Sequence, residues 1–375
     1  MRRKEFLKLS GMVLAGSALP GKTVFTELKD AATGPAKIDA RIYEVQLRHA
    51  WTLSRGTWNV RRNALVRIEK DGAAGMGEAA PIARYNENAE GVLAFIEKAR
   101  SILGKDLWQY FERWQELDAL APGEHAAKAA LDMAILDWVG KKLGVPVYRF
   151  LGLDKDKTPP TTYSIGIDEV KLMQEKVKEA GDFSVYKIKL GSKDDKAIID
   201  GIREVTSKPI RVDANEGWKT KEEALAMIDW LAGRGVELVE QPMPTGMSDE
   251  HRWLKERSKL PLFADESLMK ATDIPMIAGG FHGINIKLMK CGGIQEAVRM
   301  VAMARALGLK LMLGCMIETS LGITAGASIA PLFDCADLDG NLLITNDPFK
   351  GVQTVKDRLF LGDKPGLGVE GDVWN

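Results

Sequence analysis

Cysteine is scarce in this sequence: its 375 residues include three, Cys291, Cys315 and Cys335, all in the C-terminal half. An odd number placed in this way is a poor basis for a disulfide framework, so we expect free thiols that are buried or partly buried. Neither sign of charge is in excess, since 52 lysines and arginines balance 52 aspartates and glutamates. The absence of a basic stripe interleaved with aromatics argues against nucleic-acid binding. No apolar run approaches the roughly 20 residues that a bilayer requires, so we expect no membrane span.

The first 35 residues do not have the composition of a folded segment. Residues 1–8 are basic, and residues 11–19 form a short apolar stretch of mostly small side chains. The segment resembles a twin-arginine export signal, Arg-Arg-x-Phe-Leu-Lys, although counting back from Phe6 gives the pair Arg3-Lys4. We therefore predict a leader at residues 1–35 and a periplasmic location, with a basic tail on a cytoplasmic enzyme as the alternative.

Residues 36–155 are predicted to form an α+β domain. Some segments alternate apolar and polar residues, as half-buried strands do, and Asp71-Gly72 is a typical hairpin turn between two of them. Other segments repeat apolar residues every three or four positions or are rich in alanine and leucine, which indicates helices. The predicted strands are residues 37–47, 63–70 and 75–79, and the predicted helices are residues 90–103 and 125–143.

Strand and helix patterns alternate through residues 156–344, which we predict to be a (β/α)₈ barrel with at most one irregular unit. Eight short strand candidates start 21 to 27 residues apart, most of them separated by a segment of helical period. Residues 345–375 contain strand-like and glycine- and proline-rich pieces, and we expect this segment to return to the first domain. The predicted strands are residues 161–167, 185–190, 210–214, 237–241, 262–264, 283–287, 310–314 and 334–338, and the predicted helices are residues 169–180, 192–205, 221–233 and 294–307.

Three acidic residues, Asp213, Glu240 and Asp265, each end a mainly apolar strand of this barrel. In such barrels the C-terminal strand ends gather at one face and carry the chemistry, so the three carboxylates are expected within a few ångströms of one another. A hard divalent cation would relieve their repulsion, and a purely oxygen donor set favours Mg²⁺ or Mn²⁺ over Zn²⁺. We predict one Mg²⁺ per subunit.

Lysines flank this acidic group on both sides. Lys187 and Lys189 face the same side of their strand because side chains alternate with period two, and two such ammonium groups are expected to depress each other's pKa. On the other side Lys287 ends its own strand, whereas Lys290 is expected in the following loop. A base on each face of a metal-bound substrate suits the removal of an α-proton from one face and its return to the other. Coordinated Mg²⁺ would stabilise the enediolate that forms.

Taken together, these strand-end motifs resemble the enolase superfamily, muconate-lactonizing subgroup, over nearly the whole chain after the leader. The helix and loop at residues 130–146 resemble those that precede the barrel in that family, and the pair Asp337 and Asp339 resembles the Asp-x-Asp motif of the dipeptide epimerases. The resemblance implies that Lys189 and Lys287 exchange the α-proton of the C-terminal residue. It also implies that Lys187 tunes Lys189 and helps to neutralise the substrate carboxylate. The motifs are Lys187-x-Lys189, Asp213-x-Asn215, Glu240-Gln241-Pro242, Asp265-Glu266-Ser267, and Lys287 within Asn285-Ile286-Lys287-Leu288-Met289-Lys290-Cys291-Gly292-Gly293.

The same resemblance suggests how a dipeptide is held. Asp337 and Asp339 would bind its α-ammonium, while Asn215 and Glu266 would support the metal ligands. A mobile capping loop is expected at residues 50–63, where Arg55 aligns best with the arginine that meets the glutamate side chain, ahead of Arg61 and Arg62. Glu318 is expected either to receive a further polar group or to cap the next helix. The pocket for the N-terminal residue is expected to be lined by Cys315, Met316 and Ile317.

We therefore predict a Mg²⁺-dependent dipeptide epimerase acting on L-Ala-D/L-Glu from murein peptides, as a homo-oligomer. Alternatives with the same catalytic set are a dipeptide epimerase of another specificity, an o-succinylbenzoate synthase, an N-acyl amino acid racemase and a cycloisomerase. The last three have no reason to bind a free ammonium. A non-catalytic peptide-binding protein is the alternative from a different class, and it would need the carboxylates but not opposed lysines.

Overall fold

The structure is a computed structural model that describes residues 34–374. The predicted leader lies, except for its last two residues, outside this range. The three cysteines are free thiols, with Cys291 and Cys335 buried and Cys315 partly buried, as predicted. Among the described residues, no helix combines the length and the apolar character that crossing a bilayer would need.

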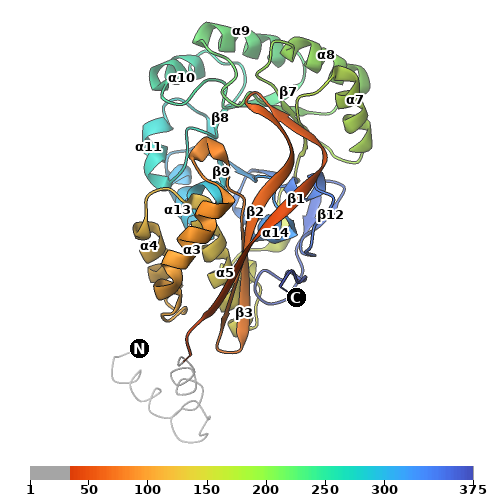
Figure 1. Cartoon of the computed structure of the whole chain (residues 1–375). Helices are drawn as coiled ribbons and strands as arrows, with labels where there is room; N and C mark the ends of the chain where they lie inside the picture. Colours follow the sequence, from red (N-terminus) through yellow and green to blue (C-terminus); the bar gives the residue numbers. More distant parts are fainter. Residues whose placement is uncertain (1–33, 375) are drawn as a thin grey trace, which may run out of the picture. The chain divides into compact units, whose positions relative to one another are not determined.

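The N-terminal domain is an antiparallel three-stranded sheet covered by helices (Figure 1). Asp71 and Gly72 form the predicted turn between the second and third strands, both with positive φ, 49° and 76°. Glycine at position 77 allows close contact between the third strand and the helix that contains Ala130, because a Cβ on Gly77 would lie 1.9 Å from the Ala130 carbonyl oxygen. The elements are β1 (Lys37–Leu53), β2 (Gly56–Lys70), β3 (Ala73–Ala79), η1 (Ala83–Tyr85), α3 (Ala89–Leu103), α4 (Tyr110–Leu120), α5 (His125–Leu143), α6 (Val147–Phe150) and η2 (Lys155–Lys157).

The predicted loop at residues 50–63 is instead the tip of the long β1–β2 hairpin. Trp51 pairs with Trp58 and Leu53 with Gly56, after an irregular register between Gln46 and Trp51. Aromatic and β-branched side chains favour this extended pairing even though the segment lacks a strict alternation of apolar and polar residues. Figure 1 shows the hairpin reaching toward the barrel strands.

Eight parallel strands follow in sequential order, and a bridge joins Ala336, in the last strand, to Thr161, two residues before the first. All eight predicted strands are present, so the predicted barrel is confirmed. The unit between β8 and β9 is irregular, with only short helices. The strands are β4 (Tyr163–Ile165), β5 (Tyr186–Lys189), β6 (Ile210–Asp213), β7 (Val236–Glu240), β8 (Leu262–Ala264), β9 (Gly283–Lys287), β10 (Lys310–Gly314) and β11 (Cys335–Asp337).

Helices cover the outside of these strands (Figure 1). One cluster of buried apolar residues runs through both domains and includes Ile68, Trp138 and Ile188, so the two share a core. The helices are α7 (Val170–Glu179), α8 (Asp195–Val205), α9 (Lys221–Ala232), α10 (Ser248–Lys255), η3 (Ala271–Asp273), α11 (Ile274–Ile277), α12 (Leu288–Cys291), α13 (Ile294–Ala306), α14 (Ser320–Ala327), η4 (Ala330–Leu332) and η5 (Gly340–Leu343).

The C-terminal segment contains a small hairpin of β12 (Gln353–Val355) and β13 (Arg358–Phe360). Its last residues contact the first domain, where the Arg41 guanidinium lies 4.7 Å from the Trp374 ring centre. A bridge joins Gly366 to Pro146 in the same domain.

Candidate active site

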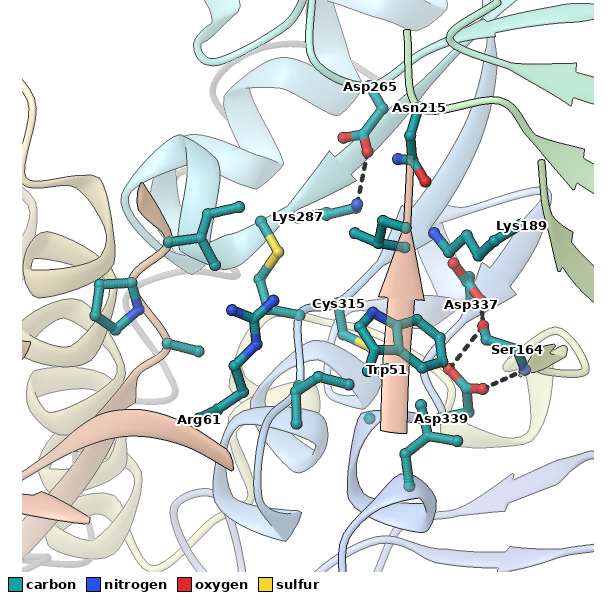
Figure 2. Close-up of a pocket in the computed structure, with 18 of the residues that line it drawn as sticks. Trp51, Arg61, Ser164, Lys189, Asn215, Asp265, Lys287, Cys315, Asp337 and Asp339 are labelled. Atoms are coloured by element: carbon teal, nitrogen blue, oxygen red, sulfur yellow. Dashed lines mark hydrogen bonds and ion pairs between the residues drawn. The ribbon is translucent and has the colours of Figure 1, made fainter. Parts of the chain in front are cut away.

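Strand register gathers the predicted site at one rim of the barrel. Lys189 lies beside Asp213, and Asp213 lies beside Glu240. On the other side Gly314 lies between Lys287 and Asp337. Of these strand-end residues, Lys189, Lys287 and Asp337 line one pocket, whose walls also include the β1–β2 hairpin (Figure 2).

Asp213, Glu240 and Asp265 form a compact carboxylate cluster, with one oxygen of each within 4.8 Å of the others. All three are buried, and burial together with Asp213 raises the pKa of Glu240 to about 8. Glu240 Oε2 and Asp265 Oδ1 accept no regular hydrogen bond from the described residues, but each lies in an ion pair, 2.9 Å from Lys187 Nζ and 2.5 Å from Lys290 Nζ. Three crowded carboxylates are the donor set that Mg²⁺ takes, so the residues fit the predicted ion.

Lys187 lies within this acidic cluster rather than in the pocket wall. Its Nζ is 2.6 Å from Asp337, 2.9 Å from Glu240 and 3.3 Å from Asp213. Burial alone would lower the pKa of Lys187, but the surrounding carboxylates hold it well above its ordinary value. The prediction that the paired lysines depress each other's pKa is therefore wrong for Lys187, because the carboxylates outweigh the neighbouring ammonium group.

Lys189 and Lys287 reach the pocket from opposite walls (Figure 2). Their strands, β5 and β9, are four positions apart among eight, which is half the way round the barrel. Lys189 Nζ lies 2.6 Å from Asp213, and Lys287 Nζ lies 2.7 Å from Asp265. Each potential base therefore adjoins one of the predicted metal ligands.

Lys290 lies in α12, not in the loop predicted for it. Its Nζ is 2.5 Å from Asp265 Oδ1 and donates to three backbone carbonyls, those of Asp265, Leu268 and Asn285. It is buried and does not line the pocket. These contacts favour Lys287 over Lys290 as the base, as predicted from its position at the strand end.

Asp337 and Asp339 both line the pocket and are joined by Ser164, whose hydroxyl lies 3.1 Å and 3.3 Å from them. Burial and the adjacent Asp337 raise the pKa of Asp339 to about 7. Thr162 also donates to Asp337, at 2.6 Å. Ser164, in β4, and Thr162, just before it, were not predicted, because hydroxyl side chains are common at the start of a strand and do not mark a site.

Arg55 lines the pocket, but its guanidinium is already paired with carboxylates of the protein. Its Nη1 lies 2.7 Å from Glu266 and 3.4 Å from Glu216, and it donates to the Asn215 carbonyl oxygen. Asn215 in turn donates to Glu266 at 3.1 Å. Arg55 therefore neutralises a buried carboxylate beside the metal ligands, and its predicted contact with substrate stays a prediction.

The remaining wall includes Cys315, Met316 and Ile317, as predicted, together with Trp51, which lies beside Lys189 and was missed. Glu318 is buried behind this wall, where it accepts from the Met316 amide at 2.7 Å. The N-cap of α14 is Thr319, so the predicted capping role of Glu318 is wrong, and its contact with a further polar group stays a prediction.

Comparison with known proteins agrees with this geometry. Residues 168–374 match the family "Enolase C-terminal domain-like", and residues 37–152 match "Mandelate racemase / muconate lactonizing enzyme, N-terminal domain". The L-Ala-D/L-Glu epimerase of Bacteroides thetaiotaomicron is 44% identical over 98% of both chains.

Solved structures of dipeptide epimerases share the fold. The substrate-liganded L-Ala-D/L-Glu epimerase from Bacillus subtilis has a TM-score of 0.85 and 32% identity, covering 89% of this chain and 98% of its own. The Enterococcus faecalis dipeptide epimerase complexed with Mg and L-Leu-L-Tyr has a TM-score of 0.84 and 33% identity, over the same shares of the two chains. The chain therefore belongs to the mandelate racemase/muconate lactonizing enzyme family of enolase-like barrels.

Proposed function

We propose that this protein is a Mg²⁺-dependent dipeptide epimerase that inverts the α-carbon of the C-terminal residue, with L-Ala-D/L-Glu as its substrate. The observation that carries the proposal is the placement of Lys189 and Lys287 on opposite walls of one pocket. A proton can be taken from one face of a planar intermediate and returned to the other only if a base stands on each side.

The rest of the pocket complements a dipeptide. Mg²⁺ held by Asp213, Glu240 and Asp265 would bind the substrate carboxylate and lower the free energy of the enediolate. Asp337 and Asp339 offer two buried carboxylates to the α-ammonium. An N-acyl amino acid racemase, an o-succinylbenzoate synthase or a cycloisomerase would leave these two aspartates without a cationic partner from the substrate.

Glutamate specificity rests on the Bacteroides and Bacillus relatives named above. The Enterococcus relative, bound to L-Leu-L-Tyr, indicates that this fold also accommodates side chains without charge. The homo-oligomer and the periplasmic location stay predictions from the sequence.

The test is proton NMR of L-Ala-L-Glu in D₂O with purified protein and Mg²⁺. We expect the glutamate α-proton signal to disappear and the L-Ala-D-Glu diastereomer to appear. Exchange on other dipeptides alone would contradict glutamate specificity. If no dipeptide in a library exchanged its α-proton, the epimerase function would be contradicted. The N-acyl amino acid racemase and the peptide-binding protein would then remain as alternatives.

A further inference from the structure

The cationic side chains that line the pocket are paired with carboxylates, with one exception. Lys189 is next to Asp213, Lys287 next to Asp265 and Arg55 next to Glu266. Arg61 also lines the pocket, yet within the described part of the chain its guanidinium has no ion-pair partner and donates no hydrogen bond. Consistent with this, burial lowers the pKa of Arg61 to about 10, and no neighbouring charge of the described residues offsets that effect.

The position of Arg61 on its strand explains why it faces the pocket. Side chains alternate along β2, so Arg61 and Asn63 lie on one face and Arg62 on the other. Both Arg61 and Asn63 line the pocket, whereas Arg62 is exposed and lies 2.6 Å from Glu90. Figure 2 shows the Arg61 side chain extending into the pocket on the same side as Lys287.

Trp58 holds the guanidinium in place. The Arg61 Cζ lies 4.2 Å from the centre of the Trp58 ring. A guanidinium that lies over an aromatic ring leaves the N–H groups at its edge free. Those groups can bind a carboxylate with two parallel hydrogen bonds. A half-buried cation without a counter-ion is costly, and an anionic ligand group would remove that cost.

From these contacts we infer that Arg61, rather than Arg55, binds the side-chain carboxylate of the substrate's C-terminal residue and sets the preference for acidic side chains. This inference rests on the proposed epimerase function and names the residue that determines its specificity. A substrate such as L-Ala-L-Glu then meets one partner for each charge: the aspartate pair for the ammonium, the metal for the α-carboxylate and Arg61 for the side chain.

The test compares kcat/KM for L-Ala-L-Glu and for its neutral isostere L-Ala-L-Gln in wild type, Arg61→Met and Arg61→Lys. We expect Arg61→Met to lower the Glu-over-Gln ratio about 10- to 100-fold, the effect of one charge-assisted contact. Arg61→Lys should recover part of the ratio because it restores the charge without the planar fork. Arg62→Met, on the outer face of the same strand, is the matched control and should leave the ratio unchanged.

The outcomes separate this inference from the proposed function. An Arg61→Met enzyme that loses activity on both dipeptides equally, or keeps the wild-type ratio, would overturn the role of Arg61 while the epimerase stands. A wild-type enzyme that epimerises dipeptides but does not prefer Glu over Gln would overturn it as well. A wild-type protein that exchanges no dipeptide α-proton would instead overturn the proposed function. If the Glu-over-Gln ratio fell in Arg55→Met but not in Arg61→Met, Arg55 and not Arg61 would be the residue that binds the side-chain carboxylate.

Discussion

For Lys187, the sequence predicts the position of the side chain but not its electrostatic surroundings. Its position beside Lys189 was predicted from the alternation of side chains in a strand, and the structure confirms it. Its electrostatics were not predicted, because they depend on Asp213, Glu240 and Asp337, which come from three other strands. The ion pair of Arg55 was not predicted for the same reason, because its partner Glu266 lies 211 positions further along the chain.

The aspartate pair at the end of β11 predicts a pH dependence. Burial and Asp337 raise the pKa of Asp339 to about 7, so this carboxyl becomes neutral as the pH falls through that value. A neutral carboxyl no longer attracts the substrate ammonium, so kcat/KM should fall about tenfold per pH unit below about pH 7. The measurement is a pH profile between about 5.5 and 8.5, with circular dichroism as the control for folding. A flat profile across the pKa of Asp339 would contradict this assignment.

At the scale of elements, the barrel strands and the longest helices were predictable, whereas α4, α10, α14 and the hairpin tip were not. The helix predicted at residues 125–143 matches α5, since its alanine-rich sequence and the glycine after it mark both the helix and its end. The β1–β2 tip was predicted as a loop because its pairing follows an irregular register, which no simple alternation reveals.

The contact between β3 and α5 predicts a loss of stability on a small substitution. In Gly77→Ala the new methyl group would lie 1.9 Å from the Ala130 carbonyl oxygen, so sheet and helix must separate. We expect the free energy of unfolding to fall by about 3 kcal/mol, measured by urea denaturation. Gly233→Ala is the control, because its methyl group would meet only the Trp230 carbonyl oxygen, at 3.9 Å. Equal stabilities for the two variants would contradict this account of the packing.

For the whole molecule, the barrel and the metal ligands were predictable because a strand–helix rhythm and strand-end carboxylates are local signals. The pocket's charge balance was not, since it requires the hairpin of one domain to lie beside the strand ends of the other. Arg61 illustrates this: alternation along the strand separates it from Arg62, but only the position of the hairpin shows which of the two faces the pocket.

The buried carboxylate cluster predicts that Mg²⁺ stabilises the folded molecule. An ion that binds only the folded state adds about 2.7 kcal/mol at a free concentration of about 100 times Kd. Thermal melting should therefore show a higher Tm with Mg²⁺ than with EDTA. The shift should disappear in Asp265→Asn, which removes one ligand charge, and should persist in Arg62→Met. A Tm that does not respond to Mg²⁺ in the wild type would contradict the metal site.

The central claim is that Lys189 and Lys287 act on opposite faces of the same α-carbon. The most direct measurement is α-proton exchange into D₂O for both diastereomers, L-Ala-L-Glu and L-Ala-D-Glu, with wild type, Lys189→Ala and Lys287→Ala. Each variant should lose epimerisation by about 10³-fold or more, as expected when an essential acid–base group is removed. Each should still exchange the α-proton of one diastereomer, and the two variants should retain opposite ones. Variants that both exchange the same diastereomer, or that both epimerise at the wild-type rate, would contradict the two-base account.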